Sequence, residues 1–263
     1  PDRMVQPLIH PTAVIDPAAK LDSSVEVGPY AVIGPHVRIG AGCKVGAHVV
    51  LEGPTTLGEN NRLYPFCSVG AAPQDKKYAG EDTALEIGNG NTIRECVTIN
   101  RGTVQDGGTT RVGDDNWIMA YVHIAHDCQI GNRTIFANNA QLAGHVHVDD
   151  WVIFGGFSGA HQFCRIGAHA MIAAGTIVLQ DVPPYVMAGG TTAAPFGLNI
   201  EGLRRRGFSS ESLQALKHAY RTLYRSGLTL EEARTKLAEE AAAHAEIQPF
   251  LDFLAVSKRG IIR

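Results

Sequence analysis

The chain of 263 residues lacks any hydrophobic run close to the roughly 20 residues that span a bilayer, and its N-terminus has no basic segment followed by an apolar one. Both absences favour a soluble, cytoplasmic protein without a membrane span. The five cysteines are odd in number and include no CxxC pair, which excludes a full disulfide framework and disfavours a cysteine-bound zinc. Aromatic residues form only 7% of the chain, so nucleic-acid binding has little support.

The charge is unevenly distributed along the chain. The formal net charge is −3, but acidic residues predominate in residues 1–190 and basic residues in residues 191–263. The two parts therefore differ in character, and the second part suits an acidic partner.

A period of six residues dominates the first part. Aliphatic residues recur at Ile9, Ile15, Leu21, Val27, Ile33, Ile39, Val45, Leu51, Leu57, Leu63 and Val69, and again at Ile87, Ile93 and Ile99. After a shift of one position the series continues at Val112, Ile118, Ile124, Ile130, Phe136, Leu142, Val148, Phe154, Ala160, Ile166, Ile172 and Val178. Neither the 3.6-residue period of a helix nor the two-residue period of a strand explains this spacing.

This period predicts a parallel β-helix over residues 1–190. Each hexad supplies a short strand and a turn, and three hexads close a triangular coil with the aliphatic residues inside. Glycine often follows the aliphatic residue, as at Gly28, Gly40 and Gly58, and we expect it to supply the backbone angles of the turn. Stacked coils then share one continuous core. Small buried core positions are expected for Cys43, Cys67, Cys128 and Cys164, which stand two residues before an aliphatic.

Two interruptions of the repeat predict loops. Asp75 and Glu81 occupy positions where aliphatic residues are due, and Gln105 does so within the glycine-rich run 102–108. Loops on a rigid scaffold often carry function. The coil is expected to end near Asp181, because two prolines follow and proline cannot donate to strand pairing.

Residues 191–263 are predicted to form a helical domain. Ser209 or Ser210 suits the N-cap of one amphipathic helix, and Thr229 suits that of a second. A third helix is expected around residues 250–256.

Histidines gather beside one predicted column of the coil. Residues 18 apart should stack in successive coils, so Ile124, Leu142 and Ala160 form a column. Four histidines stand close to this column in the sequence, and we expect them to share one corner of the prism: His123, His126, His145 and His161. His147 and His169 are assigned to a different face.

The same count places the first loop near this corner. Val69 and Ile87 are assigned to the column of His126, so the loop with Asp75 and Lys77 should leave from the same face. A histidine cluster serves either acid–base catalysis or metal binding, and a metal would need three histidines around one ion. Both interpretations stay open, beside the plain one that these are surface residues.

Longer motifs resemble one family of hexapeptide acyltransferases. These motifs are residues 123–128 (HIAHDC), 137–140 (ANNA), 142–145 (LAGH), 161–164 (HQFC), 74–80 (QDKKYAG), 180–185 (QDVPPY), 195–207 (PFGLNIEGLRRRG) and 259–263 (RGIIR). The chain is similar along its length to the acyl-carrier-protein–UDP-N-acetylglucosamine O-acyltransferases, which begin lipid A synthesis. This resemblance implies a left-handed coil, although parallel crossovers in general are right-handed in the great majority of cases.

The resemblance also implies a chemistry. His126 would remove a proton from the sugar 3-hydroxyl, which attacks the thioester of a 3-hydroxyacyl group on acyl carrier protein. Asp127 would orient His126, and the backbone N–H of Gly144 would hold the oxyanion. No cofactor and no metal are implied, since the acyl donor is carried on the phosphopantetheine of the carrier protein.

Further roles follow from the same likeness. Contacts to UDP-N-acetylglucosamine are implied for Asp75, Lys77, His123, His145, His161, Gln162, Asn199, Glu201, Arg205 and Arg206. Family members are homotrimers whose sites lie between subunits, so one site would draw on two chains. Ala174 stands where the family measures acyl length, and its methyl group should shorten or narrow the groove for the acyl chain. The basic run from Arg204 to Arg225 suits acyl carrier protein, which is acidic.

Three other functions compete with this one. The first is an N-acyltransferase later in the same pathway, against which counts the start of the repeat by residue 9. The second is a carbonic anhydrase of the γ type with zinc on three histidines, which leaves the helical part without a purpose. The third is a β-helix scaffold without chemistry, which leaves the histidines unexplained.

Overall fold

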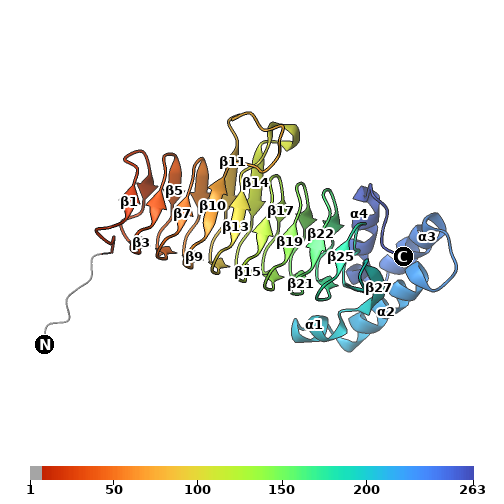
Figure 1. Ribbon diagram of the computed structural model, residues 1–263. Coiled ribbons are helices and arrows are strands. Elements are labelled where there is room, and N and C mark those ends of the chain that lie inside the picture. Colours follow the sequence, from red (N-terminus) through yellow and green to blue (C-terminus); the bar gives the residue numbers. More distant parts are fainter. Residues whose placement is uncertain (1–7) are drawn as a thin grey trace, which may run out of the picture.

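A computed structural model describes residues 8–263, in which short parallel strands form the three faces of a triangular prism (Figure 1). Sheet 1 holds β1 (Val14–Ile15), β4 (Val32–Ile33), β7 (Val50–Leu51), β10 (Ser68–Ala71), β13 (Thr98–Asn100), β16 (His123–Ile124), β19 (Gln141–Leu142), β22 (Gly159–Ala160) and β25 (Ile177–Val178). Sheet 2 holds β2 (Lys20–Leu21), β5 (Val37–Ile39), β8 (Thr55–Leu57), β11 (Ala84–Ile87), β14 (Thr109–Val112), β17 (Gln129–Ile130), β20 (His147–Val148) and β23 (Arg165–Ile166). Sheet 3 holds β3 (Glu26–Val27), β6 (Lys44–Val45), β9 (Arg62–Leu63), β12 (Thr92–Ile93), β15 (Trp117–Ile118), β18 (Ile135–Phe136), β21 (Ile153–Phe154), β24 (Met171–Ile172), β26 (Val186–Gly189) and β27 (Ala194–Leu198).

This architecture confirms the predicted fold class, a mainly β, left-handed parallel β-helix followed by helices. Ile124 pairs with Leu142, and Leu142 pairs with Ala160, so the predicted column of residues 18 apart is confirmed. The aliphatic residues point into the prism and are buried, and the rings of Phe136 and Phe154 stack there at 5.1 Å. The four cysteines assigned to small core positions are buried as well.

The two loops change the register, and one prediction made across them is wrong. Val69 pairs with Ile99 in sheet 1, and Ile99 pairs with Ile124, as expected for the His126 column. Ile87 instead pairs with Val112 in sheet 2. The reason is that residues 72–83 leave the coil altogether, so the strand that follows β10 belongs to the next face.

Most glycines that follow the aliphatic residues have a different role from the one predicted, although Gly70 does have a positive φ angle of 85°. Of Gly28, Gly40 and Gly58, none has a positive φ angle, and the corner turns instead use other residues, such as Tyr30 with φ 58°. A Cβ atom at Gly28 would lie 2.8 Å from the backbone nitrogen of Ala47 in the next coil. These glycines are therefore required by the close approach of successive coils.

The coil extends beyond its predicted end near Asp181. Val182 still pairs with Ile166, and β26 pairs in parallel with β24. The two prolines lie between these pairings, in a corner turn that needs no strand hydrogen bond. Strand β27 then returns antiparallel to β26 and leads into the helices.

Four helices follow, and three were expected. Ser209 caps α2 (Ser210–Tyr224), Thr229 caps α3 (Leu230–Ala241) with a capping box, and α4 spans Gln248–Val256. The short helix α1 (Ile200–Arg205) was not expected, and two 3₁₀ turns span Val104–Asp106 and Ala245–Ile247. The helices lie at the C-terminal end of the prism (Figure 1).

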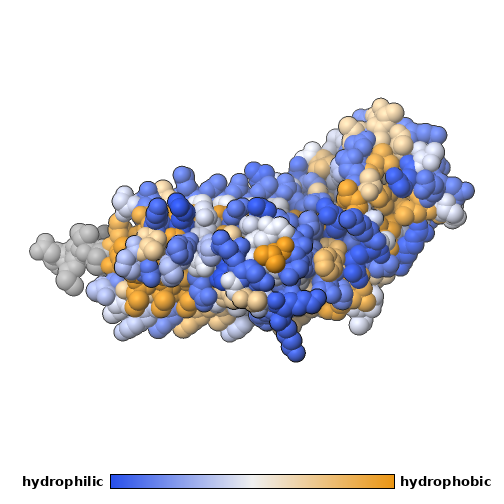
Figure 2. Space-filling view, turned by 90° about the horizontal axis from the view of Figure 1, so that it is seen from above, coloured by the Kyte–Doolittle hydropathy of each residue, from blue (hydrophilic) through white to orange (hydrophobic). Residues whose placement is uncertain are grey.

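None of the helices within residues 8–263 is both long and apolar enough to cross a bilayer. Seen from above, hydrophobic residues form orange patches at the N-terminal end of the coil and on the helical end (Figure 2). The middle of this face is mostly blue around a small orange and white patch (Figure 2). The two loops project from this side of the coil (Figure 1).

His169 ties the helical end to the coil. Its ring stacks between Trp151 at 6.2 Å and Tyr185 at 5.7 Å, and the guanidinium of Arg206 lies 3.2 Å from its Nδ1. Burial, with the positive charge of Arg206, lowers the pKa of His169 from 6.5 to about 4. The folded protein therefore keeps this ring neutral where the unfolded chain protonates it.

The first prediction concerns stability and pH. Because the unfolded state binds a proton that the folded state refuses, the free energy of unfolding should fall as pH decreases from 6.5 towards 4. The change His169→Asn should flatten this fall, measured as the unfolding temperature at several pH values. The control is His36→Asn, which also has a positive φ but is exposed. An equal slope in all three proteins would contradict the assignment.

Candidate functional site

The corner between sheets 1 and 2 concentrates the candidate residues. His126, Gly144 and Gln162 occupy equivalent turn positions in three successive coils, each between a strand of sheet 1 and a strand of sheet 2. Both loops leave this corner too, since residues 72–83 join β10 to β11 and residues 101–108 join β13 to β14. The predicted association of the first loop with the histidine corner is thus confirmed.

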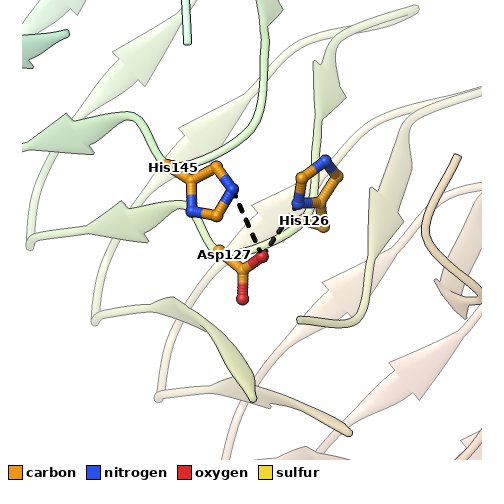
Figure 3. A group of neighbouring side chains, drawn as sticks. All are labelled: His126, Asp127 and His145. Atoms are coloured by element: carbon orange, nitrogen blue, oxygen red, sulfur yellow. Dashed lines mark hydrogen bonds and ion pairs between the residues drawn. The ribbon is translucent and has the colours of Figure 1, made fainter. Parts of the chain in front are cut away.

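Asp127 is the buried centre of the site (Figure 3). Its Oδ2 accepts hydrogen bonds from Nδ1 of His126 at 2.8 Å and from the hydroxyl of Thr103 at 2.6 Å. Its Oδ1 accepts one from the backbone N–H of Thr103 at 2.7 Å. Burial disfavours the charged carboxylate, but the hydrogen bonds from His126 and Thr103 outweigh it and hold the pKa of Asp127 below 3.8. The site therefore contains a buried carboxylate ion.

His145 is the second ring of the site (Figure 3). Its Nδ1 lies 2.8 Å from Oδ2 of Asp106, and its Nε2 lies 3.8 Å from Oδ2 of Asp127. The ring stacks on Phe163 at 4.3 Å and meets the ring of His126 edge-on at 5.0 Å. Contacts on all these sides fix its orientation.

Gly144 lies directly against His126. A Cβ atom on Gly144 would lie 2.5 Å from Cε1 and 2.7 Å from Nε2 of the His126 ring. Its backbone N–H has no hydrogen-bond acceptor within residues 8–263. The His126 ring therefore packs directly on the backbone of Gly144, whose N–H group is free to donate a hydrogen bond to a ligand.

A groove of about 990 Å³ opens beside these residues. Its walls come from both loops, the corner and the C-terminal segment, and they comprise Gln74, Asp75, Lys76, Lys77, Gln105, Asp106, His126, His145, His147, Gln162, Phe163, Arg165, Asp181, Val256, Lys258 and Arg259. His147 lies on a different face from His123, as predicted, and it also lines this groove. Its strand β20 belongs to sheet 2, and the outer side of that strand borders the corner.

Only two of the four histidines expected at the corner are in contact. His123 projects from β16, where its Nδ1 lies 2.7 Å from the hydroxyl of Thr98, and burial lowers its pKa. His161 is exposed, and its Nδ1 lies 3.3 Å from the carbonyl oxygen of Gln162. The expectation that all four imidazoles meet is wrong, because His123 lies in β16 and bonds to Thr98, while His161 is exposed and contacts the neighbouring backbone.

The remaining candidates lie at the other two corners. Asn199 caps α1 and Glu201 pairs with Arg204 and Arg205, all near the corner between sheets 2 and 3. Arg206 lies there as well, over the ring of Trp151. The exposed Ala174 follows β24, at the corner between sheets 3 and 1. One chain therefore does not bring these residues to His126.

The site offers one possible set of metal ligands among residues 8–263. One ligand atom each from His126, Asp127 and His145 lie within 4.8 Å of one another. Two histidines and a carboxylate are fewer histidines than the three expected for the zinc interpretation. The carboxylate already accepts bonds from Thr103 and His126, which leaves less of its coordination capacity for an ion.

Two residues of the site were not predicted from the sequence. Thr103 and Asp106 belong to the loop that was predicted from the glycine-rich break, but nothing in its composition indicated contacts with Asp127 and His145. The signal available was the position of the break, one coil before the histidines.

The geometry is suited to proton transfer. Because Asp127 accepts a bond from Nδ1 of His126, this nitrogen carries the proton and Nε2 keeps a free electron pair. Such a pairing of carboxylate and imidazole orients a general base. The groove beside it has room for a substrate.

Comparisons with known proteins agree with these observations. The family described as "Bacterial transferase hexapeptide (six repeats)" matches residues 18–53 and 109–144, and "Udp N-acetylglucosamine O-acyltransferase; Domain 2" matches residues 181–262. An acyl-[acyl-carrier-protein]–UDP-N-acetylglucosamine O-acyltransferase of Thiobacillus denitrificans is 66% identical over 77% of this chain and 79% of its own. One from a Janthinobacterium species is 63% identical over 78% and 79%.

Solved structures of lower sequence identity have nearly the same fold. The UDP-N-acetylglucosamine O-acyltransferase (LpxA) of Moraxella catarrhalis has a TM-score of 0.96 at 47% identity, covering 97% of this chain and 100% of its own. LpxA of Acinetobacter baumannii has a TM-score of 0.95 at 50% identity, covering 98% and 100%. The likeness extends over both the coil and the helical end.

The second prediction tests the contact between Gly144 and His126. In Gly144→Ala the new Cβ should displace the ring and break its 2.8 Å bond to Asp127, as a crystal structure of the variant would reveal. Gly34→Ala at the same corner is the control, because its nearest atom would lie 3.3 Å away. An unmoved His126 ring in Gly144→Ala would refute this account of the packing.

Proposed function

Because the chain belongs to the acyl-[acyl-carrier-protein]–UDP-N-acetylglucosamine O-acyltransferases, and so is an O-acyltransferase, we propose its reaction in detail. It transfers a 3-hydroxyacyl chain from acyl carrier protein to the 3-hydroxyl of UDP-N-acetylglucosamine, as the first step of lipid A synthesis. The observation that carries the proposal is the bond between Asp127 and Nδ1 of His126, which leaves Nε2 available beside the groove.

His126 acts as the general base. Nε2 removes the proton of the sugar hydroxyl while its oxygen attacks the thioester carbonyl carbon. When the tetrahedral intermediate collapses, the carbon–sulfur bond breaks and the protonated imidazole returns its proton to the departing thiolate. The reaction is thereby balanced without a cofactor, a metal or a covalent acyl-enzyme.

Asp127 and Gly144 assist this step. Asp127 holds the ring orientation and stabilises the imidazolium that forms, because its carboxylate is already ionised. The free N–H of Gly144 donates to the oxyanion, and its closeness to the His126 ring places donor and base on the same reacting group.

UDP-N-acetylglucosamine is bound by residues from two chains. Asp75, Lys77, His145 and Gln162 line the groove beside His126. His123 and His161 are assigned to the same binding site by the family likeness. Asn199, Glu201, Arg205 and Arg206 lie at a different corner and come from a neighbouring subunit of a homotrimer. Arginine suits the diphosphate, since its guanidinium binds oxyanions in a bidentate manner.

Acyl carrier protein approaches from the helical end, in the cytoplasm. Lys217, Arg221 and Arg225 are exposed and spaced by four residues, so they form a basic stripe along α2. None of the three forms an ion pair within residues 8–263. An unpaired basic stripe attracts an acidic carrier and speeds the encounter.

The third prediction tests the base. His126→Gln should lower kcat roughly 10²–10⁴-fold with little change in KM, because only proton transfer is lost. Transfer from 3-hydroxyacyl carrier protein to UDP-N-acetylglucosamine is the assay, and His36→Asn, at the same corner nearer the N-terminus, is the control. Near-normal turnover of His126→Gln would end the assignment.

A zinc-dependent lyase is the alternative function, because His126, Asp127 and His145 lie close enough together to bind one metal ion. Stoichiometric zinc in the purified protein, together with hydration of carbon dioxide, would favour that alternative.

The fourth prediction tests the acyl-length role of Ala174. In the proposed trimer, the corner that holds Ala174 lines the acyl groove between subunits, so removing its methyl group in Ala174→Gly should lengthen that groove. Turnover should then shift towards longer acyl chains, by about fourfold per methylene newly accommodated. Turnover is compared across carrier proteins loaded with chains of different length. Ala47→Gly, near the N-terminal end of the same corner series, should leave the preference unchanged. An identical preference in Ala174→Gly would remove this residue from the groove.

A further inference from the structure

The site contains two histidine–carboxylate pairs, His126 with Asp127 and His145 with Asp106. The loop of residues 101–108 contacts the first pair and supplies the carboxylate of the second. Thr103 is buried and donates two hydrogen bonds to Asp127, from its backbone N–H at 2.7 Å and from its hydroxyl at 2.6 Å. Three residues further on, Asp106 accepts a bond from Nδ1 of His145 at 2.8 Å. One loop therefore determines how His126, through Asp127, and His145 are held.

The contribution of Thr103 follows from the burial of Asp127. A buried carboxylate is costly unless hydrogen bonds compensate it, and Thr103 supplies two of the three donors, His126 being the third. The close approach of the loop requires Gly102, where a Cβ would lie 2.8 Å from Oδ1 of Asp127. Without the hydroxyl of Thr103, the carboxylate oxygen that faces His126 would depend on that ring alone.

Asp106 acts on the other ring. The ring of His145 stacks on that of Phe163, which prevents the His145 ring from tilting but not from rotating within its own plane. The bond from Nδ1 to Asp106 removes that freedom and turns Nε2 towards Asp127 and the groove. Asp106 also lines the groove itself, within reach of whatever His145 binds.

We propose that Thr103 and Asp106 are positioning residues of the transfer reaction. Thr103 acts on turnover, through Asp127 and His126, whereas Asp106 acts on binding of the sugar nucleotide, through His145. This inference rests on the proposed function for its kinetic consequences. It separates two effects within one loop, which a merely structural role of the loop would not do.

The fifth prediction is a split between kcat and KM. Thr103→Val keeps the shape but loses the hydroxyl donor, so kcat should fall about tenfold while KM for UDP-N-acetylglucosamine changes less than about twofold. Thr103→Ser keeps the donor and should restore kcat. Asp106→Ala should raise that KM about tenfold with kcat nearly unchanged, and Asp106→Asn, which keeps an acceptor oxygen, should recover most of the affinity.

Val104→Ala is the matched control. Val104 lies in the same short turn and its side chain is exposed, so both constants should stay at wild-type values. The proposal would be overturned if Thr103→Val and Asp106→Ala showed the same fall in kcat and the same rise in KM. It would also be overturned if Val104→Ala changed either constant as much as they do. Such a pattern would mean that the loop only supports the fold.

A second measurement does not depend on activity. Ring nitrogen resonances of ¹⁵N-labelled histidines report which nitrogen carries the proton. We expect Thr103→Val to shift the His126 signals and Asp106→Ala to shift those of His145. Unchanged signals in both variants would refute the positioning role even in an active enzyme. If wild-type protein shows no acyl transfer while the signals respond as expected, the proposed function fails and the positioning contacts stand.

Discussion

The rest of the structure depends on one constraint, the parallel pairing of the strands of each coil with those of the next coil. Every strand has only two to five residues, so no strand is stable alone. Each face is held by hydrogen bonds to the next coil, in which the paired residue stands 18 positions further on unless a loop intervenes. The same pairing brings backbones so close that a Cβ atom is excluded at positions such as Gly28. It also fixes the corner turns in line, which is why His126 and Gly144 lie in contact although 18 residues separate them.

The site exists because the pairing tolerates insertions only at a corner. Residues 72–83 and 101–108 both leave between sheets 1 and 2, where the chain turns and no strand hydrogen bond is lost. The second loop then folds back over the next coil and places Thr103 against Asp127. A charge can be buried at the surface of an apolar prism because the loop brings the donors that the coil itself lacks.

The sequence was sufficient for the coil and for part of the site. The period of six predicted the prism, and the spacing of 18 predicted that His126 and His145 would meet, because that spacing is a direct consequence of strand pairing. Register across a loop was not predictable: Ile87 changes face because the number of residues that leave the coil cannot be counted from the period. The partners Thr103 and Asp106 were missed for the same reason, since a loop path is set by tertiary contacts.

The distribution of the candidates over three corners argues for a site shared between subunits. A prism presents its corners in three directions, so Arg206, beside Trp151 at the corner of sheets 2 and 3, faces away from His126 at the corner of sheets 1 and 2. No rotation of side chains joins them, because the rigid coil separates them. If these residues act on one sugar nucleotide, as the family likeness implies, the second corner must come from another copy of the chain. In the proposed homotrimer, the open groove beside His126 would be one wall of the site and a neighbouring subunit the other.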